Sequence, residues 1–220
     1  MSETPTLSIA AGCLGFAAPF CATGETRYYL NGVFVEPGKS GAVCVATDGH
    51  TMIALRDETG HAARPAILQP GKGLAALCRK APDLVVMAKA PLAPKADVPV
   101  WLVPRDSLHA EAASGDPAGA VTVIDGEFPE WRRVFPARVP QGALAAGIQA
   151  RFYDRFRGPA EWSSSGKAAP ISVVQDGEGP ALVTPGHQAF GKSWAGLIMP
   201  MRCDPVRALP KWLGKTGIRP

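Results

Sequence analysis

The chain has 220 residues, of which 46% are hydrophobic and 19% charged, and its formal net charge is +4. This length exceeds a peptide-sized scaffold and allows a sizeable core, in one large domain or two small ones. The apolar content excludes wholesale disorder, and the small excess of Lys and Arg permits contact with phosphate without requiring it.

The beginning of the chain predicts one strand followed by one helix. Residues 7–21 are apolar and rich in alanine, which indicates a short strand and then a helix that Pro19 and Gly24 terminate. This segment contains no Lys or Arg.

A group of strands follows this helix. The β-branched and aromatic runs at residues 27–35 and 42–46, and the alternating run at 50–55, predict neighbouring antiparallel strands. Asp48-Gly49 indicates a tight turn, because glycine adopts positive φ without steric cost.

The same pattern then recurs twice. Helices are predicted at residues 71–80 and 143–157, a loop at 162–169, and strands at 65–69, 84–88, 98–103, 107–112, 120–124, 171–174, 181–184 and 194–199. The order is helix then strands, three times, which predicts an α+β protein built from one small repeated unit.

The cysteines and the apolar runs indicate the compartment. The five cysteines are odd in number, scattered, and free of metal-ligand spacing; they are Cys13, Cys21, Cys44, Cys78 and Cys203. No apolar run reaches the ~18 residues of a membrane span, and Glu3 and Pro5 stand where a basic leader would begin. We therefore expect a cytoplasmic protein that binds no metal and no membrane.

Four motifs stand out: RYYLNG at 27–32, VATDGH at 45–50, DGEFPEWRRVFP at 125–136 and MPMR at 199–202. Together, and in this order, they resemble the bacterial DNA polymerase III beta subunit, the DNA sliding clamp. Each motif alone is weak, whereas four in the family's order, the first three at near-family spacing, are specific. The resemblance implies the α+β DNA-clamp fold, with repeated helix-plus-antiparallel-strand half-units, about three in this chain.

The resemblance also implies a domain division. Residues 1–140 resemble the complete middle domain of the family, 141–202 resemble the second half of the last domain, and 203–220 form a tail. Three half-units stand where a family protomer has six, which argues against the usual dimeric ring. An odd half-unit leaves a sheet edge unpaired, and we expect self-association through 141–202 into a homo-oligomer unless the tail with Trp212 covers that edge.

A hydrophobic pocket between the two domains is the first functional site that the resemblance implies. In the family, polymerase, clamp-loader and repair proteins dock short hydrophobic peptides there. The matching positions are Leu30, Thr47, Gly49, His50, Met52, Pro136, Leu197, Ile198, Met199, Pro200 and Met201. Methionine side chains adapt to varied apolar ligands, although the residue types alone fit an ordinary core equally well. Thr51 departs from the family, which usually has a basic residue there.

A surface for double-stranded DNA is the second implied site. The family lines its ring with helices whose cations meet phosphates without reading sequence. The candidates are Arg27, Tyr28, Tyr29, Lys72, Arg79, Lys80, Arg151, Arg155 and Arg157. The alternative is that these cations are solvated helix faces and that the tyrosines pack in the sheet. The predicted first helix offers no cation, which argues against full clamp behaviour.

Residues 125–136 are expected to connect the domains. Pro129 and Pro136 exclude a continuous helix, and we expect Trp131, Val134 and Phe135 to anchor an extended segment. The neighbouring Arg132 and Arg133 would face acids or solvent.

Catalysis is not expected. Cys44, Asp48 and His50 lie close in sequence, yet no nucleophile elbow, phosphate-binding loop or metal-ligand spacing accompanies them. Two hypotheses remain, both without a cofactor. The first is a shortened sliding-clamp-like processivity factor or tether that docks partners in the pocket and encircles or cradles duplex DNA. The second is a clamp mimic that binds partner peptides without encircling DNA.

Overall fold

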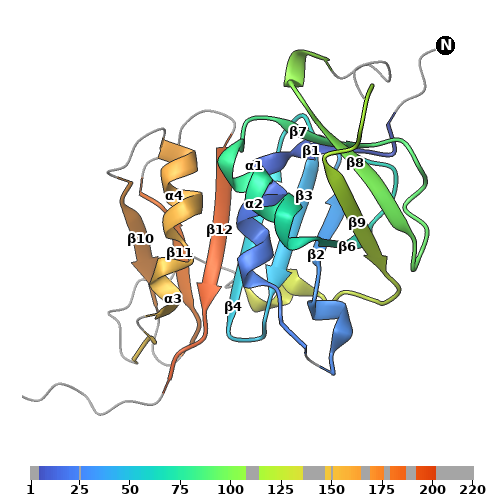
Figure 1. Ribbon diagram of the computed structural model, residues 1–220. Helices are drawn as coiled ribbons and strands as arrows, with labels where there is room; N and C mark the ends of the chain where they lie inside the picture. The colour runs from blue at the N-terminus through green and yellow to red at the C-terminus, as the bar shows by residue number, and fades with distance from the viewer. Residues whose placement is uncertain are drawn as a thin grey trace, which may run out of the picture.

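The fold is described from a computed structural model, over residues 5–24, 26–107, 114–135, 147–149, 151–164, 169–175, 179–186 and 192–201. Short helices alternate with antiparallel strands three times, as the sequence predicts (Figure 1). We call these repetitions half-units one, two and three, in chain order.

Half-unit one contains two short 3-10 helices besides one α-helix. Its elements are β1 (Leu7–Ala10), α1 (Ala11–Ala17), η1 (Ala18–Phe20), η2 (Tyr28–Leu30), β2 (Val33–Pro37), β3 (Ala42–Thr47), β4 (Thr51–Asp57) and β5 (His61–Ala62). The strand predicted from residue 27 begins only at Val33. The turn-forming pair Asn31-Gly32 separates η2 from β2, and Gly32 leaves no room for a side chain, because a Cβ there would lie 2.8 Å from Ile67 Cγ2.

Half-unit two repeats this plan. Its elements are β6 (Ala66–Pro70), α2 (Lys72–Lys80), β7 (Val85–Ala88), β8 (Asp97–Val103), η3 (Arg105–Ser107) and β9 (Gly119–Ile124). Of the strand predicted at 107–112, Ser107 belongs to η3 and the rest lies outside the described residues.

Half-unit three follows the connector helix η5 (Trp131–Val134). Its elements are α3 (Arg151–Asp154), α4 (Arg157–Ser164), β10 (Ile171–Val174), β11 (Ala181–Pro185) and β12 (Lys192–Ile198). The helix predicted over 143–157 is displaced: Gly147–Gln149 are not helical, and α4 continues to Ser164, into the predicted loop. Pro159 lies in the first turn of α4, where backbone N–H groups have no acceptor within the helix. Proline, which has no N–H, therefore favours a helix start there. The other residues between 143 and 150 lie outside the described part.

The first two half-units exchange their first strands. The described strands form one sheet in the order β10-β11-β12-β4-β3-β2-β6-β9-β8-β7-β1-β5. Within it β1 pairs with β7 of half-unit two, and β6 pairs with β2 of half-unit one, both antiparallel. Each first strand also pairs with the last strand of its own half-unit, β1 with β5 and β6 with β9. An approximate twofold axis therefore relates half-units one and two.

Half-unit three joins the sheet through its last strand. β12 pairs antiparallel with β4 over their full lengths, from Lys192 opposite Asp57 to Ile198 opposite Thr51. β10 ends the sheet on that side, at the left of Figure 1.

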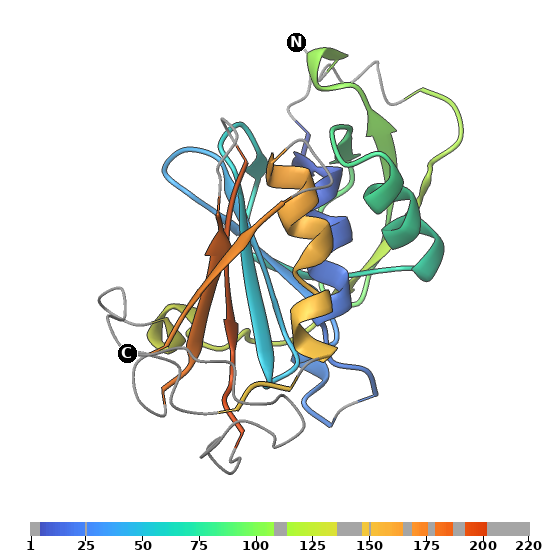
Figure 2. The same ribbon diagram turned by 90° about the vertical axis from the view of Figure 1, so that its left-hand side faces the viewer.

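Helices α1, α2 and α4 lie together on one face of the sheet, and the main core lies between them and the strands (Figure 2). All seven residues of α1 are buried, because α2 and α4 pack against it. A Cβ at Gly12 would lie 3.0 Å from Trp162 of α4, and one at Gly15 would lie 2.8 Å from the backbone nitrogen of Arg79 in α2. The absence of Lys and Arg from α1 follows from this burial.

A buried carboxylate links the first two half-units. Asp57, at the end of β4 and 6% exposed, accepts hydrogen bonds from the backbone N–H of Ala10 at 2.7 Å and from Arg105 at 3.0 Å. Its other oxygen accepts from the amide and the hydroxyl of Thr59. The side chain therefore joins the start of α1 in half-unit one to η3 in half-unit two.

Candidate functional site

The β3–β4 hairpin turn is held by its own side chains. Asp48 Oδ1 accepts hydrogen bonds from the amides of His50 at 2.9 Å and Thr51 at 2.8 Å. Gly49 has φ of +86°, as expected for the Asp-Gly turn. The Thr47 hydroxyl accepts from the Gly49 amide and donates to the Thr51 carbonyl. The turn is therefore rigid before any contact from half-unit three.

Arg155, between α3 and α4, clamps this turn. Its Nη1 lies 2.6 Å from Asp48 Oδ2 and also donates to the Thr51 hydroxyl. Burial raises the pKa of Asp48, but the bonds from Thr51, Arg155 and His50 outweigh it and hold the pKa below its usual value. The Phe152 ring stacks on His50 at 6.3 Å, and the Met199 amide donates to the His50 carbonyl at 2.8 Å. Half-unit three therefore contacts the turn through an ion pair, an aromatic ring contact and a backbone hydrogen bond.

A second hydrophobic cluster lies on the sheet face opposite the helices. Alternation along the strands directs Val45, Met52 and Leu197 to this face, while Cys44, Ile53 and Ile198 point into the main core. We call it the outer cluster; its buried members are Ala22, Leu30, Val45, Met52, Ile67, Phe128 and Leu197.

The predicted pocket residues divide between these environments. Leu30, Met52 and Leu197 come together in the outer cluster, whereas Ile198 is fully buried on the helix side. Met199 and Met201 are 38% and 47% exposed beside the turn. The remaining predicted positions are Thr47, which is buried; Gly49 and His50, which are exposed; Pro200, which is half-buried; and Pro136, which lies outside the described residues.

The connector covers part of the outer cluster. Trp131 and Phe135 are half-buried against it, with their rings edge to face at 5.8 Å. Arg132 pairs with Glu36 at 2.8 Å, as expected for a residue facing an acid. Val134 was expected to anchor the segment, but it is 39% exposed, because η5 turns it away from the cluster.

The cations predicted to contact DNA do not form one group. Lys72, Arg79 and Lys80 are exposed on α2, and Arg151 and Arg157 are exposed on α3 and α4. Arg155 is committed to Asp48, and Arg157 lies 3.5 Å from Asp154. The charges available on the helix face are therefore fewer than the sequence indicates.

The candidates before β2 lie elsewhere. Tyr28 and Tyr29 sit in η2 rather than in the sheet, with their rings 5.9 Å apart. The Arg27 guanidinium lies against Gly49 of the hairpin turn, 3.3 Å from where a Cβ would stand. These residues therefore do not lie on the face that carries α2 and α4; Arg27 lies beside the β3–β4 hairpin turn.

Two hollows lie on the helix side. One, of about 720 Å³, is lined by Asn31, Gln69, Lys72 and Arg79 among others, and the second, of about 480 Å³, lies between Phe16, Arg79 and Arg157. Arg79 borders both. Asn31 and Gln69 were not predicted from the sequence as site residues, because they are far apart along the chain and share no motif.

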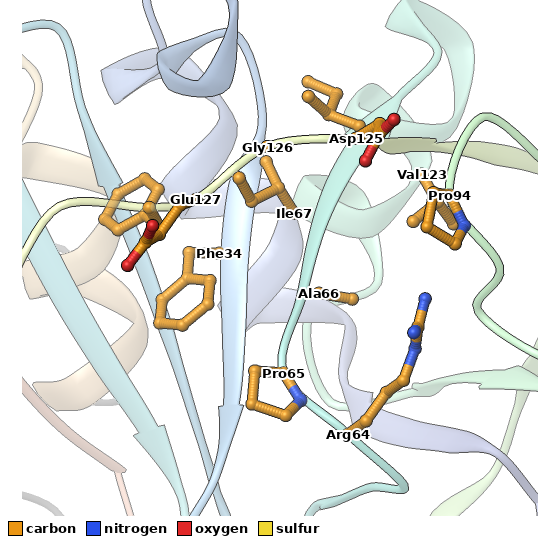
Figure 3. A pocket seen from close by; sticks show the side chains of 12 residues that line it. Phe34, Arg64, Pro65, Ala66, Ile67, Pro94, Val123, Asp125, Gly126 and Glu127 are labelled. Atoms are coloured by element: carbon orange, nitrogen blue, oxygen red, sulfur yellow. The ribbon is translucent and has the colours of Figure 1, made fainter.

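Figure 3 shows a third hollow, of about 340 Å³, at the β2–β6–β9 end of the outer face. Phe34 stacks on Phe128 at 4.8 Å along one side, Arg64 stands at the other, and Asp125 and Glu127 lie on the rim. Neither Phe34 nor Arg64 was predicted from the sequence as a site residue.

Of the four described cysteines, Cys13, Cys44 and Cys78 are buried and Cys21 is partly buried. Hydrogen bonding between Cys13 and Cys44, together with burial, raises the pKa of Cys13 well above its usual value. Burial raises the pKa of Cys21 to about 12 and that of Cys78 to about 11. These three thiols therefore stay protonated at neutral pH. Among the described residues, no three His, Cys, Asp or Glu side chains gather as metal ligands.

The described helices include none with the length and apolar content to cross a membrane.

Comparisons with known proteins agree with the sequence motifs. No protein-family model matches the chain. The beta sliding clamp of Vibrio cholerae is 33% identical over 116 residues, which are 52% of this chain and 28% of that protein. The beta sliding clamp of Escherichia coli K12 is 31% identical over 124 residues, 56% of this chain and 30% of that protein. The match thus spans less than a third of these relatives.

Solved structures show the same fold. The DNA polymerase III subunit beta from Pseudomonas aeruginosa aligns with a TM-score of 0.53 at 18% identity, covering 92% of this chain and 68% of that one. The beta subunit from DNA polymerase of Streptococcus pyogenes aligns with a TM-score of 0.54 at 12% identity, covering 92% and 67%. The predicted resemblance and the predicted α+β clamp fold are confirmed.

Proposed function

We propose that this chain, which has the fold of the beta sliding clamp over part of that protein's length, is a non-catalytic processivity factor or tether for DNA polymerase and related proteins, active in the cytoplasm. The pairing of β12 with β4, which we call the β12–β4 seam, carries the proposal, because it sets Met52 and Leu197 side by side in the outer cluster. The likeness to proteins named beta sliding clamp supports it.

The seam is also the basis for a partner-binding pocket. Leu30, Met52 and Leu197 supply an apolar floor, and the exposed thioethers of Met199 and Met201 supply an adaptable rim. The rigid Asp48-Gly49 turn offers backbone groups beside that rim. We propose that a short hydrophobic peptide of a polymerase, clamp-loader or repair protein binds there.

Replacing both Met199 and Met201 with aspartate is expected to weaken binding of a short, fluorescently labelled hydrophobic peptide by about tenfold or more, since two charges would face apolar side chains. Fluorescence anisotropy measures the affinity. Leu77→Asp is the matched control, because Leu77 is equally exposed, at 44%, but lies on α2. Unchanged affinity in the double variant would refute the pocket.

Duplex DNA is the proposed partner of the helix face. Lys72 and Arg79 border one hollow, and Arg79 and Arg157 border the next, so these cations follow the face where α2 and α4 lie. Lys80 and Arg151 extend it. Such contacts bind phosphates without reading sequence.

The double variant Lys72→Ala, Lys80→Ala is expected to weaken duplex binding and to reduce the slope of log affinity against log salt by about 2, because each lysine that contacts a phosphate contributes about 0.9. Titration of linear and circular duplexes at several salt concentrations measures this. Lys39→Ala, on the β2–β3 hairpin, removes an exposed lysine away from the helices and should leave the slope unchanged.

The second candidate function is a clamp mimic that binds partner peptides without encircling DNA. The ion pair of Arg155 with Asp48 favours it, since it commits one of the candidate cations to the hairpin turn. Peptide binding without salt-sensitive DNA binding would select the mimic.

A further inference from the structure

Half-unit three has only part of the contacts that complete the other two. In half-units one and two, the first strand of each lies against the second strand of the other, β1 on β7 and β6 on β2. β10 is the first strand after the helices of half-unit three, so it occupies the position of β2 and β7. Within the described ranges only β11 pairs with it.

The contact internal to the half-unit is present. β1 and β6 each reach the last strand of their own half-unit. Correspondingly, Gly147, shortly before α3, bridges Met201, shortly after β12, and the Met201 amide donates to the Gly147 carbonyl at 2.8 Å. Half-unit three therefore follows the same plan, but the described part of the chain contains no sister half-unit for it.

The side of β10 that faces away from β11 pairs with no described strand, and its backbone groups have the geometry for pairing. The Gly186 amide donates to the Pro170 carbonyl at 2.8 Å, and the register continues with Ser172 opposite Thr184. Because alternate residues of an antiparallel pair face the partner, the amides and carbonyls of Ile171 and Val173 point away from β11. The strand Ile-Ser-Val-Val carries no charge or proline, the usual protection of an edge.

We propose that half-unit three of a second copy of this chain completes the domain. The chain entering α3 at Gly147 of one copy would lie along β10 of the other, and reciprocally, which reproduces the β1–β7 and β6–β2 exchange about a true twofold axis. A second copy fits this place because like half-units already pair with each other within the chain, and a twofold exchange satisfies both edges at once. The inference goes beyond the proposed function, since it requires neither DNA nor a peptide.

The full chain tests this by light scattering and amide hydrogen exchange at several protein concentrations. We expect a monomer–dimer equilibrium, with the Ile171 and Val173 amides protected as the dimer forms. A monomer at every concentration would overturn the proposal. If the two amides are then protected, another segment of the same chain covers β10.

Val173→Pro removes an outward amide and is expected to weaken dimerisation about 10- to 100-fold. Val173→Thr, which keeps the amide and nearly the same shape, should stay dimeric. Circular dichroism establishes that both variants fold. If the Val173→Pro protein folds and dimerises like the parent, the contact lies elsewhere and the proposal is overturned. If it does not fold, the concentration dependence of hydrogen exchange in the parent protein decides between the outcomes.

Discussion

Replacing Asp57 with alanine is expected to lower the free energy of unfolding by about 3 kcal/mol, the largest effect that we expect of a single substitution. The carboxylate is 6% exposed and satisfies the Ala10 amide, Arg105 and both donors of Thr59. Without it, a buried amide at the start of α1 has no acceptor and Arg105 loses its counter-charge. The Arg105 side chain is 35% exposed, so solvent limits its share.

Urea unfolding at neutral pH measures this loss. Asp97→Ala is the matched control, because Asp97 is an exposed carboxylate that accepts one hydrogen bond from Thr122 at 2.6 Å. The control should change stability by less than about 0.5 kcal/mol. If Asp57→Ala lost as little stability as the Asp97→Ala control, half-units one and two would hold together without this link.

Replacing Arg155 with alanine is expected to cost about 2 kcal/mol, because Asp48 is only 14% exposed and would lose its cation. The pKa of Asp48 is lowered in the folded protein, so its contribution to stability is present above the ordinary pKa of about 3.9 and is lost as pH falls through the lowered value. The stability difference between parent and variant should therefore shrink in acid.

Unfolding in urea at neutral and acidic pH tests this, with hydrogen exchange reporting on β12. Arg157→Ala provides the control, since its pair with Asp154 is 70% and 72% exposed and should contribute little. Equal stability losses for the two arginines, or a difference that grows in acid, would contradict the assigned role of Arg155.

The sequence predicted the strands and the clamp fold because local signals and tertiary packing agree there. The β3–β4 hairpin is an example: alternating residues flank Asp48-Gly49, and the turn forms as expected. The prediction failed where tertiary packing decides. Residues 28–30 have strand-forming side chains, yet they form η2, and α4 begins at Arg157, where the sequence predicted a helix to end.

The candidate site shows the same division. Leu30, Met52 and Leu197 were selected through the resemblance to the family's pocket, and the structure gathers them in one cluster. The pairing of Arg155 with Asp48 joins residues far apart in sequence, and no spacing rule indicates it. Ile198 follows Leu197 directly but points the other way, because β12 pairs in full register with β4.

The β12–β4 seam also orders the events of synthesis. These strands are separated by more than half of the chain, so β4 leaves the ribosome long before its neighbour exists. Half-units one and two contain all the partners for their mutual strand exchange and can fold as a nascent domain. The edge of β4 stays unpaired until β12 has been synthesised. During that interval a chaperone or another nascent chain has access to this edge.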